Sequence, residues 1–329
     1  MQMNDDVYDP NDRKYITQLA YITPWNANGY DLAASTAHKL THVSPVWFQA
    51  RANLKERKNT DCEIEGSHEI NRKWITEMVQ KNSNIKIVPR IIFDGWSREE
   101  FQQLLYNAQF SKKCFETIAR FFSRNQFNGA VVEFYTQALF ATQSLTDKEL
   151  IIESLEQLAT EMRKQKLLVI VTVPAPLEWN NTPNNFITSH DFEQLISFSD
   201  LVQIMTYDYR GNKPNGVAPY YWIENCLLYL QSYNFKTLVG LNYYGYNFSS
   251  ASIEAINSKG FLDALRDKET VLEFDENCME HRLRSSTSVV YFPSLTSIEL
   301  RTNLAHRYRL GIAIWEYGQG LDYFTNLLL

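Results

Sequence analysis

The sequence is poor in several features that would place it in a special class of protein. Only 12 of its 329 residues are glycine and 10 are proline, which excludes collagen-like and low-complexity chains and argues against disorder. No apolar run is long enough to span a bilayer. The 32 lysine and arginine residues are scattered along a chain of formal net charge −6, so the concentrated positive face of a nucleic-acid-binding protein is missing.

The N-terminal residues Met1–Asp12 are polar and acidic, with no apolar stretch after a basic start. No signal peptide is therefore visible. This predicts a cytoplasmic protein, unless the chain is a mature or cloned fragment.

Cysteine is also scarce. Cys62, Cys114, Cys226 and Cys278 are far apart and form no CxxC pair, which argues against a zinc site or a redox motif. Cys114 and Cys226 lie in helix-like contexts, and we expect them to be buried apolar thiols. We expect no metal and no cofactor.

Aromatic residues, by contrast, are abundant: 19 Phe, 19 Tyr and 7 Trp make up 14% of the chain. Many of them lie in or just after short stretches that are rich in β-branched residues and carry few charges, a pattern typical of buried strands. The predicted strands are Gln18–Thr23, Leu40–Phe48, Ile85–Ile92, Gly129–Phe134, Leu167–Val173, Leu201–Thr206, Thr237–Tyr243 and Gly311–Trp315.

Helical patterns separate most of these strands. Residues 150–164 give the clearest one, with apolar side chains at three- and four-residue steps on one face. Further helices are predicted at 100–106, 114–122, 191–198, 223–230 and 297–308. Strands that alternate with helices predict an α/β fold of the (β/α)8 TIM-barrel type over residues 16–329, after an N-terminal tail at 1–15.

One connection is too long for a single helix. Residues 247–294 are predicted to be a small insertion after strand seven, with a helix over Ile253–Arg266 followed by short strands. No change of composition marks it as an independent domain.

The carboxyl ends of the predicted strands are crowded with aromatic rings. Working residues of such barrels lie at this end. Packing of the barrel top explains part of the enrichment. The sharper interpretation is a cleft lined by flat apolar faces and hydroxyl groups, which suits a sugar chain.

Three motifs on the last strands carry a resemblance to a known family. Residues 203–209 read QIMTYDY, residues 240–245 read GLNYYG and residues 311–315 read GIAIW. They resemble the M-x-Y-D signature, the G-L-P-x-Y-G motif and the tryptophan-bearing last strand of glycoside hydrolase family 18, the chitinases and chitinase-like lectins. The runs YITPWN (21–26), VSPVW (43–47), IVPR (87–90) and WEYGQGLDY (315–323) resemble one branch, the stabilin-interacting chitinase-like proteins.

Strand four departs from the catalytic pattern of that family. Catalytic members carry D-G-x-D-x-D-x-E there, and the last Glu is the general acid of a reaction in which the substrate's acetamido oxygen is the nucleophile. This sequence reads NGAVVEFY over 128–135, so the lumen-facing positions hold Val131, Glu133 and Tyr135. Tyr135 takes the acid's place, and a phenol is a poor proton donor near neutral pH. We expect no catalytic residue.

Glu133 is the remaining carboxylate of this strand. It lies one lumen layer below Tyr135, roughly 6 to 7 Å along the strand. A buried Glu needs a partner, and Arg90 on strand three is the nearest candidate, which predicts a structural Arg90–Glu133 pair. An active retaining glycosidase that uses Glu133 as a displaced acid stays open as the alternative.

The resemblance implies a carbohydrate-binding protein that takes chito-oligosaccharide or a related glycan, with lipopolysaccharide among the candidates. It implies a secreted or lysosomal protein and a scavenger receptor of the stabilin type as partner. A third interpretation is a receptor-interacting protein whose cleft is vestigial. The predicted carbohydrate-binding residues are Trp25, Trp47, Trp96, Tyr135, Tyr207, Asp208, Tyr243 and Trp315.

Overall fold

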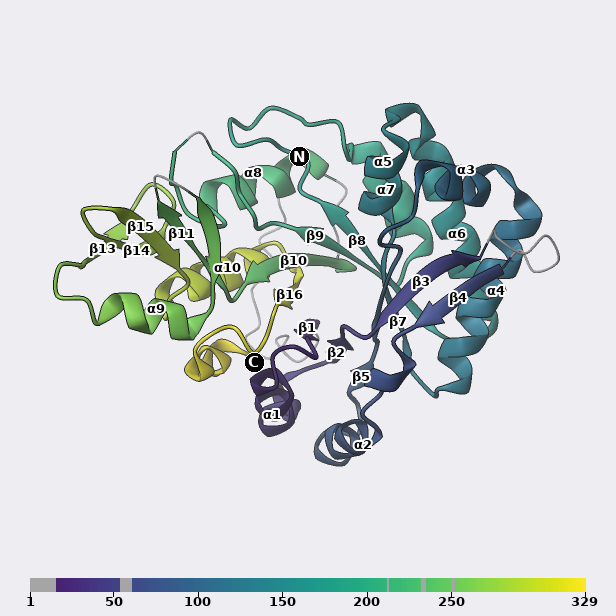
Figure 1. Ribbon diagram of the computed structural model, residues 1–329, viewed down its shortest axis with the longest axis horizontal. Helices are drawn as coiled ribbons and strands as arrows, with labels where there is room; N and C mark the ends of the chain where they lie inside the picture. The colour runs from purple at the N-terminus through teal and green to yellow at the C-terminus, as the bar shows by residue number, and fades with distance from the viewer. Residues whose placement is uncertain (1–15, 54–60, 212, 232–234, 250–251) are drawn as a thin grey trace.

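A parallel barrel forms the centre of the molecule (Figure 1). The computed structural model describes residues 16–53, 61–211, 213–231, 235–249 and 252–329; the predicted tail at 1–15 lies outside the described residues. The barrel sheet consists of β1 (Gln18–Ile22), β2 (His42–Pro45), β3 (Phe48–Asn53), β4 (Asp61–Glu65), β5 (Lys86–Ile87), β6 (Arg90–Ile92), β7 (Gly129–Glu133), β8 (Leu168–Pro174), β9 (Leu201–Met205), β10 (Thr237–Asn242) and β16 (Gly311–Trp315).

The strands follow the order β4-β3-β6-β7-β8-β9-β10-β16-β1-β2-β5. Because β2 and β3 are successive parts of one strand position, and β5 and β6 of another, this order closes on itself. The predicted (β/α)8 fold is therefore confirmed. Strands two and three are each interrupted, the latter at Val88–Pro89, where proline supplies no N–H for the ladder. β4 is an antiparallel addition that the sequence did not predict.

Helices cover the outside of the barrel. They are α1 (Asn28–Ser35), α2 (Arg72–Lys81), α3 (Arg98–Tyr106), α4 (Ala108–Arg124), α5 (Tyr135–Thr142), α6 (Lys148–Lys164), α7 (Ser189–Phe198), α8 (Tyr220–Leu230) and α10 (Leu295–Arg307), with 3₁₀ helices η2 (Ala37–Lys39), η3 (Ser67–Glu69), η4 (Leu145–Asp147) and η5 (Asp322–Leu327). Helix α6 buries the predicted apolar face against the sheet. Helices α1, α2 and α5 were not predicted.

The insertion after strand seven forms a second, antiparallel sheet at one end of the molecule (Figure 1). It contains β11 (Gly245–Ser249), β12 (Ile253–Ile256), α9 (Ser258–Leu265), β13 (Val271–Asp275), β14 (Glu280–Arg284) and β15 (Ser288–Phe292). The predicted helix over Ile253–Arg266 is wrong at its start, because Asn257 accepts a hydrogen bond from Gly260 N (3.1 Å) and begins α9 there.

A buried carboxylate joins this insertion to the barrel. Glu280 on β14 accepts hydrogen bonds from Val217 N at 3.0 Å and Ala218 N at 2.9 Å, in the segment between β9 and α8. Its Oε1 also lies 3.2 Å from Nη2 of the buried Arg301 on α10. The insertion is thus tied to the strand ends above the barrel.

One set of apolar side chains fills the barrel lumen, and a second set fills the layer between the strands and the outer helices. Alternate residues point into the lumen, and the lumen cluster consists of Leu19, Tyr21, Val46, Val88, Val131, Ile170, Leu201, Leu238 and Ala313. The other side chains of the same strands join the helices in a much larger outer layer. A side chain's membership of one set or the other decides whether it can reach a ligand in the lumen.

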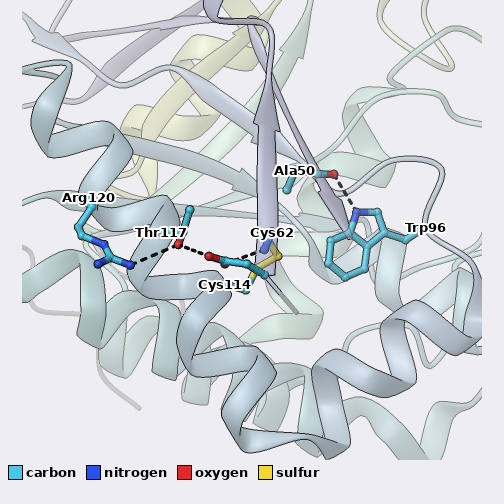
Figure 2. The surroundings of a disulfide bond; sticks show 7 residues. Ala50, Cys62, Trp96, Cys114, Thr117 and Arg120 are labelled. Atoms are coloured by element: carbon cyan, nitrogen blue, oxygen red, sulfur yellow. Dashed lines mark hydrogen bonds between the residues drawn. A yellow bond between two sulfur atoms is a disulfide. The ribbon is translucent and has the colours of Figure 1, made fainter. Parts of the chain in front are cut away.

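A disulfide bond fastens β4 to α4 (Figure 2). It joins Cys62 to Cys114, whose side chains are both buried, so the prediction of a free thiol at Cys114 is wrong. Cys226 is a buried free thiol. Beside the disulfide, Thr117 Oγ1 donates to Asp61 Oδ2 at 3.0 Å. The disulfide therefore fixes the β3–β4 hairpin against helix α4.

Candidate functional site

A charged pair stands in the lumen at the carboxyl end of the barrel. Arg90 Nη1 lies 2.7 Å from Glu133 Oε2, and Gln137 Nε2 donates to Glu133 Oε1 at 3.0 Å. The side chains of Arg90 and Glu133 are only 13% and 19% exposed. Both carboxylate oxygens of Glu133 are thus engaged by donors from the protein itself.

Two phenols and an amide continue the polar layer across the lumen. Tyr21 OH donates to Gln203 Oε1, and Gln203 Nε2 donates to Tyr207 OH at 3.2 Å. Burial raises the pKa of Tyr21, and the negative charge of Glu133 raises it further. Burial likewise raises the pKa of Tyr207. Both hydroxyls stay protonated at physiological pH, so they can donate and accept hydrogen bonds but not act as bases.

Trp315 lies at the end of β16 beside this polar layer. Its side chain is half-buried, and its ring centre lies 5.1 Å from that of Tyr21. Arg90 Cζ is 5.7 Å from the centre of the Trp315 ring, within reach of a cation–π contact. The residues predicted as a sugar floor and as a structural pair are thus direct neighbours.

A second carboxylate lies just beyond the carboxyl end of β9. Asp208 is exposed, adopts a positive φ of 61° and accepts hydrogen bonds from the hydroxyls of Tyr244 and Tyr246. Arg210 Nη2 donates to Tyr246 OH at 3.2 Å, with Cζ 4.6 Å from that ring's centre. Burial and the adjacent Asp208 raise the pKa of Tyr244. The two tyrosine rings are buried, so the groups that this cluster exposes to a ligand are the anion Asp208 and the cation Arg210.

Tyr135 lies elsewhere than its sequence position predicts. Strand β7 ends at Glu133, and α5 begins at Tyr135, so the alternation of side chains stops before Tyr135 is reached. The side chain is fully buried in the outer layer, where its hydroxyl donates to Phe186 O at 2.8 Å. The position that resembles the family's acid does not face the lumen.

Of the other aromatic residues predicted to bind sugar, some are buried in the outer layer like Tyr135 and others are not. Trp47, Trp96 and Tyr243 are buried in the outer layer, where Trp47 Nε1 donates to Tyr30 OH at 2.7 Å and Trp96 Nε1 to Ala50 O at 2.8 Å. Trp25, by contrast, is 67% exposed. The structure therefore brings Glu133, Arg90, Tyr207 and Trp315 together, with Asp208 just beyond the carboxyl end of β9.

Sequence reasoning missed several members of this site. The two-residue alternation that places Leu19 in the lumen would also have placed Tyr21 there. The same rule applied to β9 finds Gln203, because Leu201 is a lumen residue. Gln137 lies on the unpredicted helix α5, and no strand rule could find it.

The described residues contain neither a cluster of metal ligands nor a membrane-spanning helix. Within those ranges no group of three or more His, Cys, Asp or Glu side chains could hold a metal ion. No helix in the described part of the chain is long and apolar enough to cross a membrane.

Comparisons with known proteins agree with the barrel. The model of the family "Glycosyl hydrolases family 18" matches residues 17–320. The uncharacterized glycosylase YvbX of Bacillus subtilis is 20% identical over 187 residues, 53% of this chain and 54% of that protein. The cortical fragment-lytic enzyme of Bacillus anthracis is 25% identical, over 45% of this chain and 38% of that protein. The chain thus spans about half the length, or less, of the curated relatives it matches.

A solved structure extends the likeness to nearly the whole chain. The chitinase from Chromobacterium violaceum superposes with a TM-score of 0.78 at 19% identity, over 95% of this chain and 98% of that one. At this identity the likeness shows the fold alone.

Proposed function

The chain belongs to glycosyl hydrolase family 18, and from that premise we propose that it binds a glycan at the barrel cleft without hydrolysing it. The observation that carries the proposal is the state of the two decisive positions on β7. Glu133 is held by Arg90 and Gln137, and Tyr135 is buried outside the lumen. Neither is arranged to protonate a glycosidic oxygen, because a general acid must reach that oxygen with a transferable proton.

Chito-oligosaccharide or a related N-acetylated glycan is the proposed ligand. Trp315 offers a ring face, while Tyr207 and Asp208 offer a hydroxyl and a carboxylate to sugar hydroxyls and amides. Beside Glu133, the buried Arg90 Nε and Gln137 Oε1 have no partner among the described residues. A buried water is a fitting partner for this donor and acceptor and would link them to a hydroxylated ligand. Lipopolysaccharide and a stabilin-type receptor stay predictions of the resemblance.

Calorimetric titration with chitotetraose tests the binding. We expect measurable heat at millimolar ligand and a loss of about three- to ten-fold in affinity for Trp315→Ala, because an aromatic contact contributes about 0.5–1.5 kcal/mol beyond its buried area. Tyr106→Ala is the matched control, because Tyr106 is an exposed ring on α3 and not at a strand end. Absence of heat with the wild-type chain would contradict glycan binding.

An active glycosidase is the second candidate, because Glu133 is a partly exposed carboxylate in the lumen. A fluorogenic chitobioside distinguishes it from the first. Under the main proposal neither the wild-type chain nor Glu133→Gln releases the fluorophore. Hydrolysis by the wild-type chain that disappears in Glu133→Gln would establish the enzyme instead.

We also propose that the protein matures in an oxidising compartment and is secreted or lysosomal. The Cys62–Cys114 disulfide supports this, because such bonds persist mainly outside the reducing cytosol. Fractionation of cells, followed by thiol alkylation and mass measurement, tests the proposal. A cytosolic protein with both thiols alkylated would contradict it.

A further inference from the structure

Two sequence runs that the resemblance singled out meet in space. One is the segment at 23–27 between β1 and α1, and the other is the segment at 316–320 that follows β16. Asn26 Nδ2 donates to Glu316 Oε1 at 2.6 Å, and Gly318 N donates to Glu316 Oε2 at 3.1 Å. Glu316 is only 1% exposed, so its carboxylate acts inside the protein and not on solvent.

The backbone of the second segment also lies close to Gly29 in the first turn of α1, directly after the first segment. A Cβ atom added to Gly318 would lie 2.5 Å from Gly29 N and 2.7 Å from Gly29 Cα, which is closer than real Cβ contacts. The approach therefore requires glycine at 318. Burial raises the pKa of Glu316, while the two N–H donors oppose this effect. The fold keeps a desolvated carboxyl at this contact, which indicates that the contact has a role beyond filling space.

The contact is adjacent in the sequence to two tryptophans. Trp25 precedes Asn26 and Trp315 precedes Glu316 in the chain. Trp25 is 67% exposed and Trp315 is half-buried beside the Arg90–Glu133 pair. Tyr317 N also donates to Tyr21 O at 3.0 Å, which anchors the second segment to β1. Any shift of the two segments would change the spacing of the two indole rings.

We propose that Glu316 is a positioning residue that, through Asn26 and Gly318, fixes the segment bearing Trp25 relative to Trp315 so that both rings contact one glycan. The proposal rests on the proposed glycan binding and assigns Trp25 to the same site as Trp315. It also explains why the motifs at 21–26 and 315–323 occur in one chain: each supplies one half of the same contact.

A double-mutant cycle in glycan affinity tests this coupling. We expect Trp25→Ala and Glu316→Ala each to weaken chitotetraose binding about three- to ten-fold, and the double variant to bind no more weakly than Trp25→Ala alone. Asn26→Ala removes the same hydrogen bond from the other side and serves if Glu316→Ala fails to fold. Glu224→Ala is the matched control, because Glu224 contacts Tyr308 OH (3.2 Å) and lies on α8. Losses that multiply in the double variant would refute the coupling.

A readout without ligand separates this inference from glycan binding itself. In a 5-fluorotryptophan-labelled chain, the Trp25 fluorine resonance is assigned by its loss in Trp25→Phe. We expect Glu316→Ala and Asn26→Ala to shift or broaden it, Glu316→Gln to restore it in part, and Glu224→Ala to leave it unchanged. An unmoved Trp25 resonance in folded Glu316→Ala would overturn the positioning role. A wild-type chain that gives no heat with chitotetraose refutes the proposed function, while the resonance still decides whether Glu316 positions Trp25.

Discussion

Replacing Tyr135 by glutamate should not create a glycosidase, although it restores the residue type that catalytic relatives are expected to carry at this position. Tyr135 is fully buried in the outer layer at the start of α5, and its hydroxyl donates to Phe186 O. A glutamate there would occupy the same apolar surroundings and would not reach the lumen. Asp191 adds negative charge nearby, since it contributes to the raised pKa of Tyr135.

The cost of this substitution can be worked from burial. A buried glutamate must be neutral, and protonating it at pH 7 against a usual pKa of about 4.3 costs about 4 kcal/mol. Loss of the tyrosine hydrogen bond adds about 1 kcal/mol. We therefore expect Tyr135→Glu to lower the free energy of unfolding by about 5 kcal/mol at pH 7. Because the folded-state pKa of the new carboxyl lies above its unfolded value, the penalty should shrink by about 1.4 kcal/mol per unit as pH falls toward 4.3.

Urea unfolding followed by tryptophan fluorescence at several pH values measures the stability, and chitobioside hydrolysis measures the activity. Tyr135→Phe is the control: it loses the hydrogen bond alone, about 1 kcal/mol, with no pH dependence. Hydrolysis by Tyr135→Glu, absent from Tyr135→Phe, would refute the conclusion that α5 keeps this position out of the lumen.

Three further predictions concern the pair, the disulfide and the insertion. Arg90→Met should lower the free energy of unfolding by about 1–3 kcal/mol in urea unfolding, since it leaves Glu133 without its cation; Arg90→Lys should recover part of the loss, and equal losses would contradict an ionic role. Replacing Cys62 and Cys114 together by alanine should lower the free energy of unfolding by about 4 kcal/mol, because the disulfide closes a loop over a 52-residue separation. Urea unfolding without reductant, compared with the wild-type chain, measures this loss. An unchanged urea midpoint would contradict a stabilising disulfide. Glu280→Ala should cost about 3–5 kcal/mol and raise proteolysis within the insertion, and an unaltered digestion pattern would show that other contacts hold the insertion.

The barrel could be predicted from the sequence because its signal is local. Each predicted strand overlaps at least one strand of the barrel, and helix α6 buries the face that its apolar spacing indicates. The disulfide could not be predicted, because a separation of 52 residues says nothing about distance in space until β4 and α4 are packed. Helix α5 was missed because its buried residues follow directly on those of β7, so that strand and helix read as one apolar run.

The site was predicted only in part, for a related reason. The alternation rule holds while a strand continues, so it places Val131 in the lumen and Glu133 beside Arg90. It fails at Tyr135, where the chain turns into α5. Trp47 and Trp96 show the other limit: a ring near a strand end can face either the lumen or the helices, and sequence position does not decide between them.

The lumen residues that differ from the family's catalytic pattern are consistent with one another. Acid–base catalysis by carboxyl groups depends on neighbours whose protonation preferences are driven apart. Here Val131 on β7 contributes no carboxyl. Arg90 on β6 is the register partner of Val131, and its side chain reaches Glu133, two residues further along β7. Because Val131 supplies no carboxyl and Arg90 engages Glu133, we expect that Tyr135→Glu alone introduces no hydrolysis. Under the proposed function, the same groups present a charge pair, an amide and a tryptophan ring to a hydroxylated ligand, and none of them is placed to protonate a glycosidic oxygen.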